Sequence, residues 1–238
     1  MQNIFELFAI DMLSTYIAIV AAIWTSMVLF NRWRQDKDPL TASLVLTFIL
    51  QTLGLIGATF SEVFLRVFVI PDLVPVMSFL FSLTFLISFV PMAYFYGGLF
   101  QPRNKWYIPT IGFLAGNATM LTALAGEFYD PPIEVYLFLF LLTLLVFVPL
   151  GYSCFKTAPM ASRITTKAKF WLVGSWGVTY FLSYVVIFIL TIFEASTLSL
   201  YVAFTIAGFL ISGAYVAAWL GWVMPDWFRS WLIKRFGE

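Results

Sequence analysis

Long apolar runs alternate with short polar connections along the whole chain. Seven such runs fall at about 8–30, 41–65, 73–98, 106–126, 133–155, 169–193 and 198–224. Each is long enough to cross a hydrocarbon core of about 30 Å as a helix that rises about 1.5 Å per residue. Unpaired peptide groups find no water inside lipid, so a segment that spans it must be helical. The pattern predicts an all-α integral membrane protein, a seven-transmembrane-helix bundle that forms a single membrane domain over residues 1–238.

A shorter mixed segment follows the seventh run. Pro225 ends the run, and residues 226–236 combine aromatic side chains such as Trp227 and Trp231 with basic ones such as Arg229. Tryptophan favours the boundary between lipid and water, and basic side chains favour anionic head groups. The segment is therefore predicted to be a short C-terminal interfacial helix.

Basic residues lie almost entirely on one side of the predicted spans. Of the 13 lysines and arginines, all except Arg66 fall on the side that also carries the C-terminus. Because basic loops favour the cytoplasm, we expect the N-terminus outside and the C-terminus cytoplasmic. The expected location is the plasma (cytoplasmic) membrane, with membrane lipids as the surroundings.

Composition excludes several classes of function. Hydrophobic residues make up 62% of the chain and charged residues 11%, whereas soluble domains carry about 25% charged residues. The composition therefore does not describe a soluble domain. The net charge of +1 says nothing about partners, because the charges are sorted by side, and nucleic-acid binding has no support in the sequence. The chain has no histidine and one cysteine, Cys154, so the usual ligands of haem, zinc and copper are missing and no metal site is predicted. No G-x-S-x-G or H-E-x-x-H pattern occurs, so we expect no catalytic residues and no enzyme activity.

The outline of seven spans with an external N-terminus resembles that of the microbial rhodopsins. That family binds retinal through a lysine in the seventh span, but the run 198–224 contains no lysine. No acidic residue stands in the middle of the third span to serve as a counter-ion. A retinal Schiff base is therefore excluded and no cofactor is predicted, which leaves bound lipid or a non-covalent pigment as the remaining candidates.

Neutral polar residues stand near the middle of several predicted spans. Gln51 and Asn117 matter most, because a carboxamide in hydrocarbon needs partners for both its N–H₂ group and its carbonyl. Together with Ser183 they fit the floor of a pocket for a small uncharged ligand. The alternative is hydrogen bonding between helices, which is worth about 0.6 kcal/mol on average in membranes.

Aromatic residues recur at one-turn spacing in the sixth span. Trp176, Tyr180 and Tyr184 form this stripe, which suits either a flat hydrophobic ligand or core packing. We include Tyr180 and Tyr184 with the midplane polar residues as predicted ligand-binding positions.

Glu62 and Arg66 form the third candidate site, at the outer end of the second span. Their spacing of four residues places them on one helix face. A gate or a zwitterionic head group would use such a pair, and an interfacial ion pair is the alternative. Ionisable residues are absent from the middle of every predicted span, which argues against a proton pump or a cation-coupled transporter.

Small residues line the seventh run in two adjacent rows. Such rows let a neighbouring helix approach closely, so they predict a packing seam within the bundle or against a partner subunit. Ser212 and Tyr215 stand beside this seam. Its members are Gly213, Ala214, Ala217, Ala218 and Gly221.

Two hypotheses for function follow from these patterns. The first is a non-enzymatic seven-helix protein that acts by binding, either as a sensor-like or receptor-like module for a cytoplasmic signalling partner or as an accessory subunit beside another membrane protein. The second is a facilitator transporter for a small uncharged or lipophilic solute. A continuous polar cleft through the middle of the bundle would favour the second, and a dry, packed middle would count against it.

Overall fold

The computed structural model describes residues 2–66, 74–101, 103–125, 133–192 and 197–237, with side chains described for most of these positions. Within those ranges every regular element is a helix, and six helices are long and apolar enough to cross a membrane. The prediction of an all-helical chain with several helices able to span a membrane is confirmed, and the count of seven spans and their orientation stay predictions. The elements are α1 (Gln2–Asp36), α2 (Pro39–Arg66), α3 (Val74–Phe100), α4 (Tyr107–Ala125), α5 (Ile133–Thr157), η2 (Ala158–Met160), α6 (Ile164–Ile192), α7 (Thr197–Trp222) and α8 (Asp226–Phe236).

The helices extend past the apolar runs at the end of the bundle that carries the basic connections. Helix α1 continues to Asp36, and α6 begins at Ile164, before the apolar run that starts at 169. The run ends where polar side chains begin, but nothing in those side chains stops a helix, so the backbone hydrogen bonds continue. The short helix predicted over 226–236 is confirmed as α8, and its position on a membrane surface stays a prediction.

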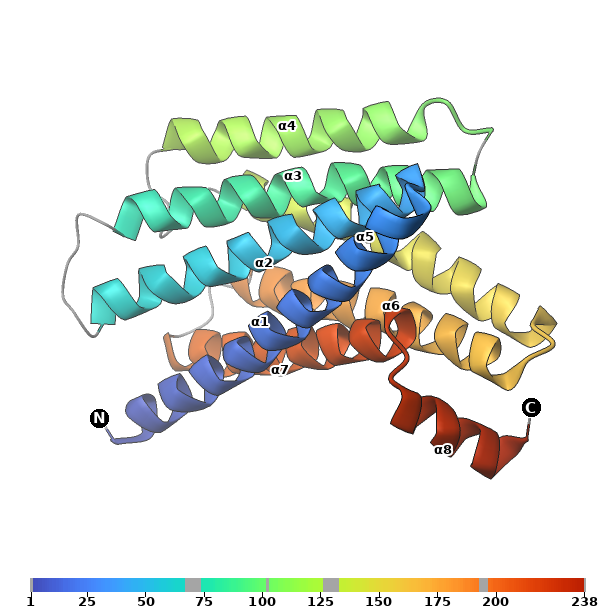
Figure 1. Ribbon diagram of the computed structural model, residues 1–238. Coiled ribbons are helices and arrows are strands. Elements are labelled where there is room, and N and C mark those ends of the chain that lie inside the picture. The colour runs from blue at the N-terminus through green and yellow to red at the C-terminus, as the bar shows by residue number, and fades with distance from the viewer. Residues whose placement is uncertain (1, 67–73, 102, 126–132, 193–196, 238) are drawn as a thin grey trace.

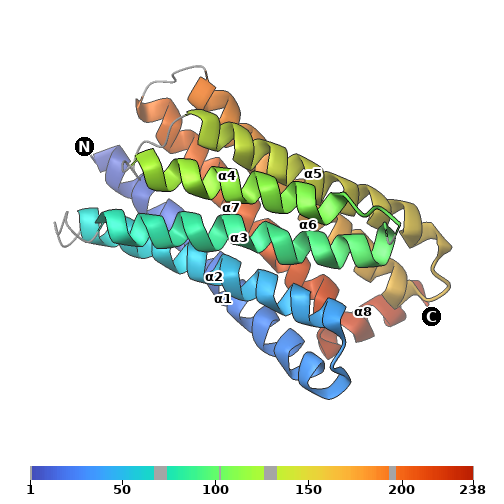
Figure 2. The same cartoon turned by 90° about the horizontal axis from the view of Figure 1, so that it is seen from above.

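Consecutive helices form a closed ring. Each of the seven long helices contacts the next one along the chain, and α7 also contacts α1. Helix α3 contacts α5 directly, and α4 packs mainly on those two helices at the periphery, where it forms the upper edge of the bundle in Figure 1. Figure 2 shows the bundle from this side, with α4 in front. The connections α1–α2, α3–α4 and α5–α6 lie at the same end of the bundle as α8 and the C-terminus (Figure 1). We call this the basic end, because 12 of the 13 lysines and arginines stand in it or beside it.

A two-residue turn joins α1 to α2. Lys37 ends α1 in the left-handed region, with φ 54°, and its backbone N–H donates to the carbonyl of Trp33. Asp38 then begins α2, and its Oδ2 accepts from both the backbone N–H and the hydroxyl of Thr41, each at 2.7 Å. Pro39 occupies the first helical position, where no backbone N–H is needed. The turn thus stops one helix and caps the next.

The Asp38 cap predicts a pH-dependent contribution to stability. The two bonds from Thr41 hold the pKa of the Asp38 carboxyl below its ordinary value. A depressed carboxyl pKa stabilises the fold at neutral pH, and this contribution is lost as the pH falls through the folded pKa. We expect Asp38→Ala to lower stability at pH 7 by about 1 kcal/mol, the typical value of an N-cap. Asp38→Asn keeps a hydrogen-bond acceptor and should lose less stability at pH 7 than Asp38→Ala does.

Thermal unfolding of the three proteins at pH 7 and at pH 3 measures this difference. The difference in unfolding temperature between wild type and Asp38→Asn is expected to be smaller at pH 3 than at pH 7, because the wild-type carboxylate is then becoming protonated. The same difference in unfolding temperature at both pH values would show that the charge of Asp38 contributes nothing to stability.

Glycines bring α5 and α6 unusually close together. A Cβ atom placed on Gly177 would lie 2.8 Å from the carbonyl oxygen of Phe147, and one on Gly151 would lie 3.2 Å from the carbonyl oxygen of Gly174. Both contacts are with backbone atoms of the other helix. The two helices therefore meet backbone to backbone, which is the geometry that small residues permit in membranes.

Candidate functional site

A polar group lies in the centre of the ring. The Tyr215 hydroxyl on α7 donates to Oε1 of Gln51 on α2 at 2.9 Å, and both side chains are fully buried. The Nε2 group of Gln51 is also buried and has no hydrogen-bond partner among the described residues. The ring of Tyr180 on α6 lies 6.0 Å from the Tyr215 ring and 5.6 Å from the ring of Tyr184, one turn further along α6. We call these four residues the central polar group.

Aromatic rings surround the central polar group. Phe48 stacks on Trp176 with ring centroids 5.3 Å apart, and Phe147 lies 4.5 Å from the Tyr180 ring. Phe85 stacks on Tyr184 at 5.6 Å. Trp176, Tyr180 and Tyr215 are among the largest fully buried side chains in the described part of the chain. The predicted aromatic stripe of α6 therefore faces the core, where its rings fill the middle of the bundle.

The structure brings together only part of the predicted ligand-binding set. Gln51, Tyr180 and Tyr184 meet in the central polar group. Ser183 is buried, but its hydroxyl donates to the carbonyl of Tyr180 on its own helix. Asn117 lies on the peripheral helix α4 and donates to the carbonyl of Phe113, again on its own helix. No continuous polar cleft links these positions within the described residues.

The other two predicted sites have different outcomes. The side chains of Glu62 and Arg66 lie outside the described residues, so their ion pair stays a prediction. In the small-residue seam of α7, Ala214 and Ala218 are fully buried, and a Cβ on Gly221 would lie 3.0 Å from the Val173 side chain of α6.

The remaining two members of the seam lie differently. Ala217 is half-buried. Gly213 is exposed, with nothing within 4 Å of the position its Cβ would occupy. One part of the seam thus packs inside the bundle, while Gly213 lies on its outer surface.

A cavity at the basic end was not predicted from the sequence. It has a volume of about 310 Å³ and lies between α1, α3, α5, α6 and α7. Its walls are mainly apolar and include Phe95, Leu150, Phe170 and Trp222. We call it the basic-end cavity. Its volume is at the lower end of the roughly 300–1,000 Å³ range of small-molecule sites.

Two cations line this cavity. Arg32 of α1 is exposed and Lys169 of α6 is half-buried, and both are part of its lining. Arg229 stands on α8, and α8 contacts α6, the helix that carries Lys169. The basic-end cavity therefore combines apolar walls with two basic side chains from different helices.

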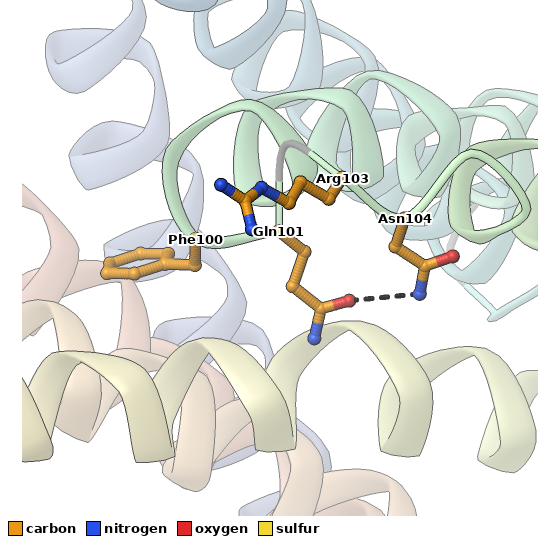
Figure 3. Close-up of a pocket in the computed structure, with 4 residues that line it drawn as sticks. All are labelled: Phe100, Gln101, Arg103 and Asn104. Atoms are coloured by element: carbon orange, nitrogen blue, oxygen red, sulfur yellow. Dashed lines mark hydrogen bonds between the residues drawn. The ribbon is translucent and has the colours of Figure 1, made fainter.

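A second, wide-open hollow adjoins the α3–α4 connection (Figure 3). Its volume is about 400 Å³, and it is lined by Phe100, Gln101, Arg103 and Asn104. The Gln101 amide donates to the Tyr96 hydroxyl at 3.1 Å, and its carbonyl accepts from Asn104 at 3.2 Å. Gln101 thus bonds to Tyr96 and to Asn104, which also lines the hollow. Phe100 lines both this hollow and the basic-end cavity.

The described residues hold no group of three His, Cys, Asp or Glu side chains placed to bind a metal ion. Comparisons with protein-family models, with curated proteins and with solved structures give no match to this chain. The central polar group and the basic-end cavity are therefore the two features of the molecule that bear on its function.

Proposed function

We propose that this chain is a non-enzymatic seven-helix membrane protein that acts by binding, as a sensor-like or receptor-like module. In this proposal all seven long helices span the membrane, with the N-terminus outside and the basic end in the cytoplasm. The observation that carries it is the basic-end cavity, an apolar chamber with a cationic rim that is bounded by five of the helices. A ligand in such a chamber contacts most of the bundle at once, so binding can alter how the helices pack.

The packed middle of the bundle supports binding over transport. Trp176, Tyr180, Tyr215, Phe48 and Phe147 are all buried there and contact one another in a connected cluster. A facilitator needs a polar route past this level, and the hydroxyl of Ser183 and the amide of Asn117 bond to their own helices instead. A facilitator transporter therefore remains the less favoured alternative.

The accessory-subunit version of the proposal draws on the outer surface. Gly112 and Gly116 of α4 and Gly213 of α7 have nothing within 4 Å of the positions their Cβ atoms would occupy. Helix–helix association in membranes uses such small residues. A binding module that also contacts a second membrane protein would do so there.

Native mass spectrometry after extraction in polymer-bounded native nanodiscs tests the binding proposal. We expect the wild-type protein to retain an additional small-molecule mass. Thr166 lines the basic-end cavity and is exposed, so Thr166→Trp should block the cavity without disturbing the core and should abolish retention. Thr165 does not line the cavity, so Thr165→Trp serves as the matched control and should keep the bound mass.

Solute flux into proteoliposomes tests the alternative, a facilitator transporter. We expect glycerol and urea to enter no faster than into protein-free liposomes. Flux above that background that disappears in Gln51→Leu, together with no retained mass in the wild type, would replace the binding proposal with the facilitator.

A further inference from the structure

We propose that the basic-end cavity binds an anionic amphiphile with a single alkyl chain, of which a fatty acid is the simplest example. The inference rests on the proposed function, because it names the class of ligand for the same cavity. It follows from two properties of the lining: walls that suit a hydrocarbon chain, and a rim that suits one negative charge.

The walls offer contact area and few hydrogen bonds. Leu150 and Val173 are buried and Phe170 is half-buried, and they come from α5 and α6 on the inner side of the cavity. Thr166 is the only neutral hydroxyl in the lining, and the Trp222 indole N–H is buried without a partner. A nucleotide base or a sugar would leave most of its polar atoms unpaired against such walls, at a substantial desolvation cost. A hydrocarbon chain needs no partners there.

The rim supplies the positive charge that the chain's head group would meet. Arg32 and Lys169 stand on different helices and both line the cavity, and Arg229 stands on α8, which contacts α6. Like charges held together repel one another, and an anion between them removes that repulsion. A guanidinium can also pair with two oxygens of a carboxylate or phosphate. A neutral amphiphile would fill the walls and leave this charge unpaired.

Equilibrium binding of radiolabelled dodecanoate tests the inference, with the protein in nanodiscs of zwitterionic phosphatidylcholine. Empty nanodiscs measure the partition of the probe into lipid. We expect a saturable component in wild type above that background. The double variant Arg32→Gln/Lys169→Gln should bind roughly tenfold or more weakly, the change that a loss of about 1.4 kcal/mol produces.

A matched double variant controls for net charge. Arg34→Gln/Lys167→Gln removes the same two charges from the same two helices, at positions outside the cavity lining. We expect it to bind dodecanoate as wild type does. Dodecanol, which has the same chain without the charge, should displace the probe weakly, and acetate and inorganic phosphate should not displace it at all.

Two further competition experiments identify the chemical source of the anion. Stronger displacement by dodecyl phosphate than by unlabelled dodecanoate would support a phosphate head group on a single chain. If the labelled dodecanoate is displaced only when the protein is in nanodiscs that contain phosphatidylglycerol, the ligand is a two-chain lipid and the single-chain ligand is overturned. Absence of saturable binding in wild type, or equal binding by both double variants, would also overturn the inference. If a different mass is still retained in native nanodiscs and lost in Thr166→Trp, the proposed function stands while this inference fails.

Discussion

Valine at position 177 is expected to separate α5 from α6. A Cβ atom on Gly177 would lie 2.8 Å from the carbonyl oxygen of Phe147 and 3.4 Å from the backbone nitrogen of Gly151. Backbone atoms cannot rotate away as the end of a flexible side chain does, so the helices themselves must move. Overpacking of this kind typically costs about 1–3 kcal/mol, and the two methyl groups of valine extend the overlap. We expect Gly177→Ala to lower the unfolding temperature and Gly177→Val to prevent recovery of folded protein.

Size-exclusion chromatography in mild detergent, followed by thermal unfolding of the monomer peak, measures both effects. The control is Gly213, which is also a glycine within a long helix but has open space where its Cβ would lie. Gly213→Ala should be neutral or stabilising in the purified monomer, because alanine favours helix over glycine by up to about 1 kcal/mol. Equal losses at the two positions would show that α5 and α6 are not in backbone contact.

Removal of the Tyr215 hydroxyl is expected to give the second large effect. Tyr215→Phe leaves Gln51 buried with neither its Oε1 nor its Nε2 group paired among the described residues, because Tyr215 is the partner of the first and the second has no partner there. A buried polar group left without a partner costs about 1–3 kcal/mol. This exceeds the net value of an average hydrogen bond between membrane helices, about 0.6 kcal/mol.

The double variant Gln51→Met/Tyr215→Phe separates the two contributions. Methionine fills a similar volume without polar atoms, so the double variant should recover most of the stability lost in Tyr215→Phe. The measurement is thermal unfolding of wild type, both single variants and the double variant, read as a double-mutant cycle. Additive losses would show that the two side chains are energetically independent, and the hydrogen bond between them would then contribute nothing.

Hydropathy alone predicted where the helices lie, since lipid forces any long apolar segment to pair its backbone internally. It did not predict which faces meet. Lipid is as apolar as the core, so a tyrosine inside the bundle and one outside it have similar sequence surroundings. Tyr215 is fully buried, whereas Tyr94 is 44% exposed on α3. For the same reason Gly177, where a Cβ would meet the backbone of α5, could not be told from Gly213, where a Cβ would meet open space.

The candidate sites, like the helix faces, could be predicted from the sequence only in part. Gln51 was predicted because a carboxamide in a membrane is conspicuous by its chemistry, but its partner Tyr215 was placed only beside a packing seam. The basic-end cavity was not predicted at all. Arg32 and Lys169 come from the first and sixth helices and were counted as ordinary basic residues of the cytoplasmic side. Only the closure of the ring brings them to one cavity.

The order of the helices around the ring also determines when the protein can finish folding. Each helix contacts the one made just before it, so the ring grows by neighbours during synthesis, but α1 meets its second neighbour only when α7 arrives. The Ser212 hydroxyl of α7 donates to the backbone carbonyl of Ser14 on α1 across this last junction. Gln51 is likewise made long before Tyr215. A chain that stops short of α7 therefore lacks the Tyr215 hydroxyl that donates to Gln51 Oε1, in addition to the α1–α7 contact that closes the ring.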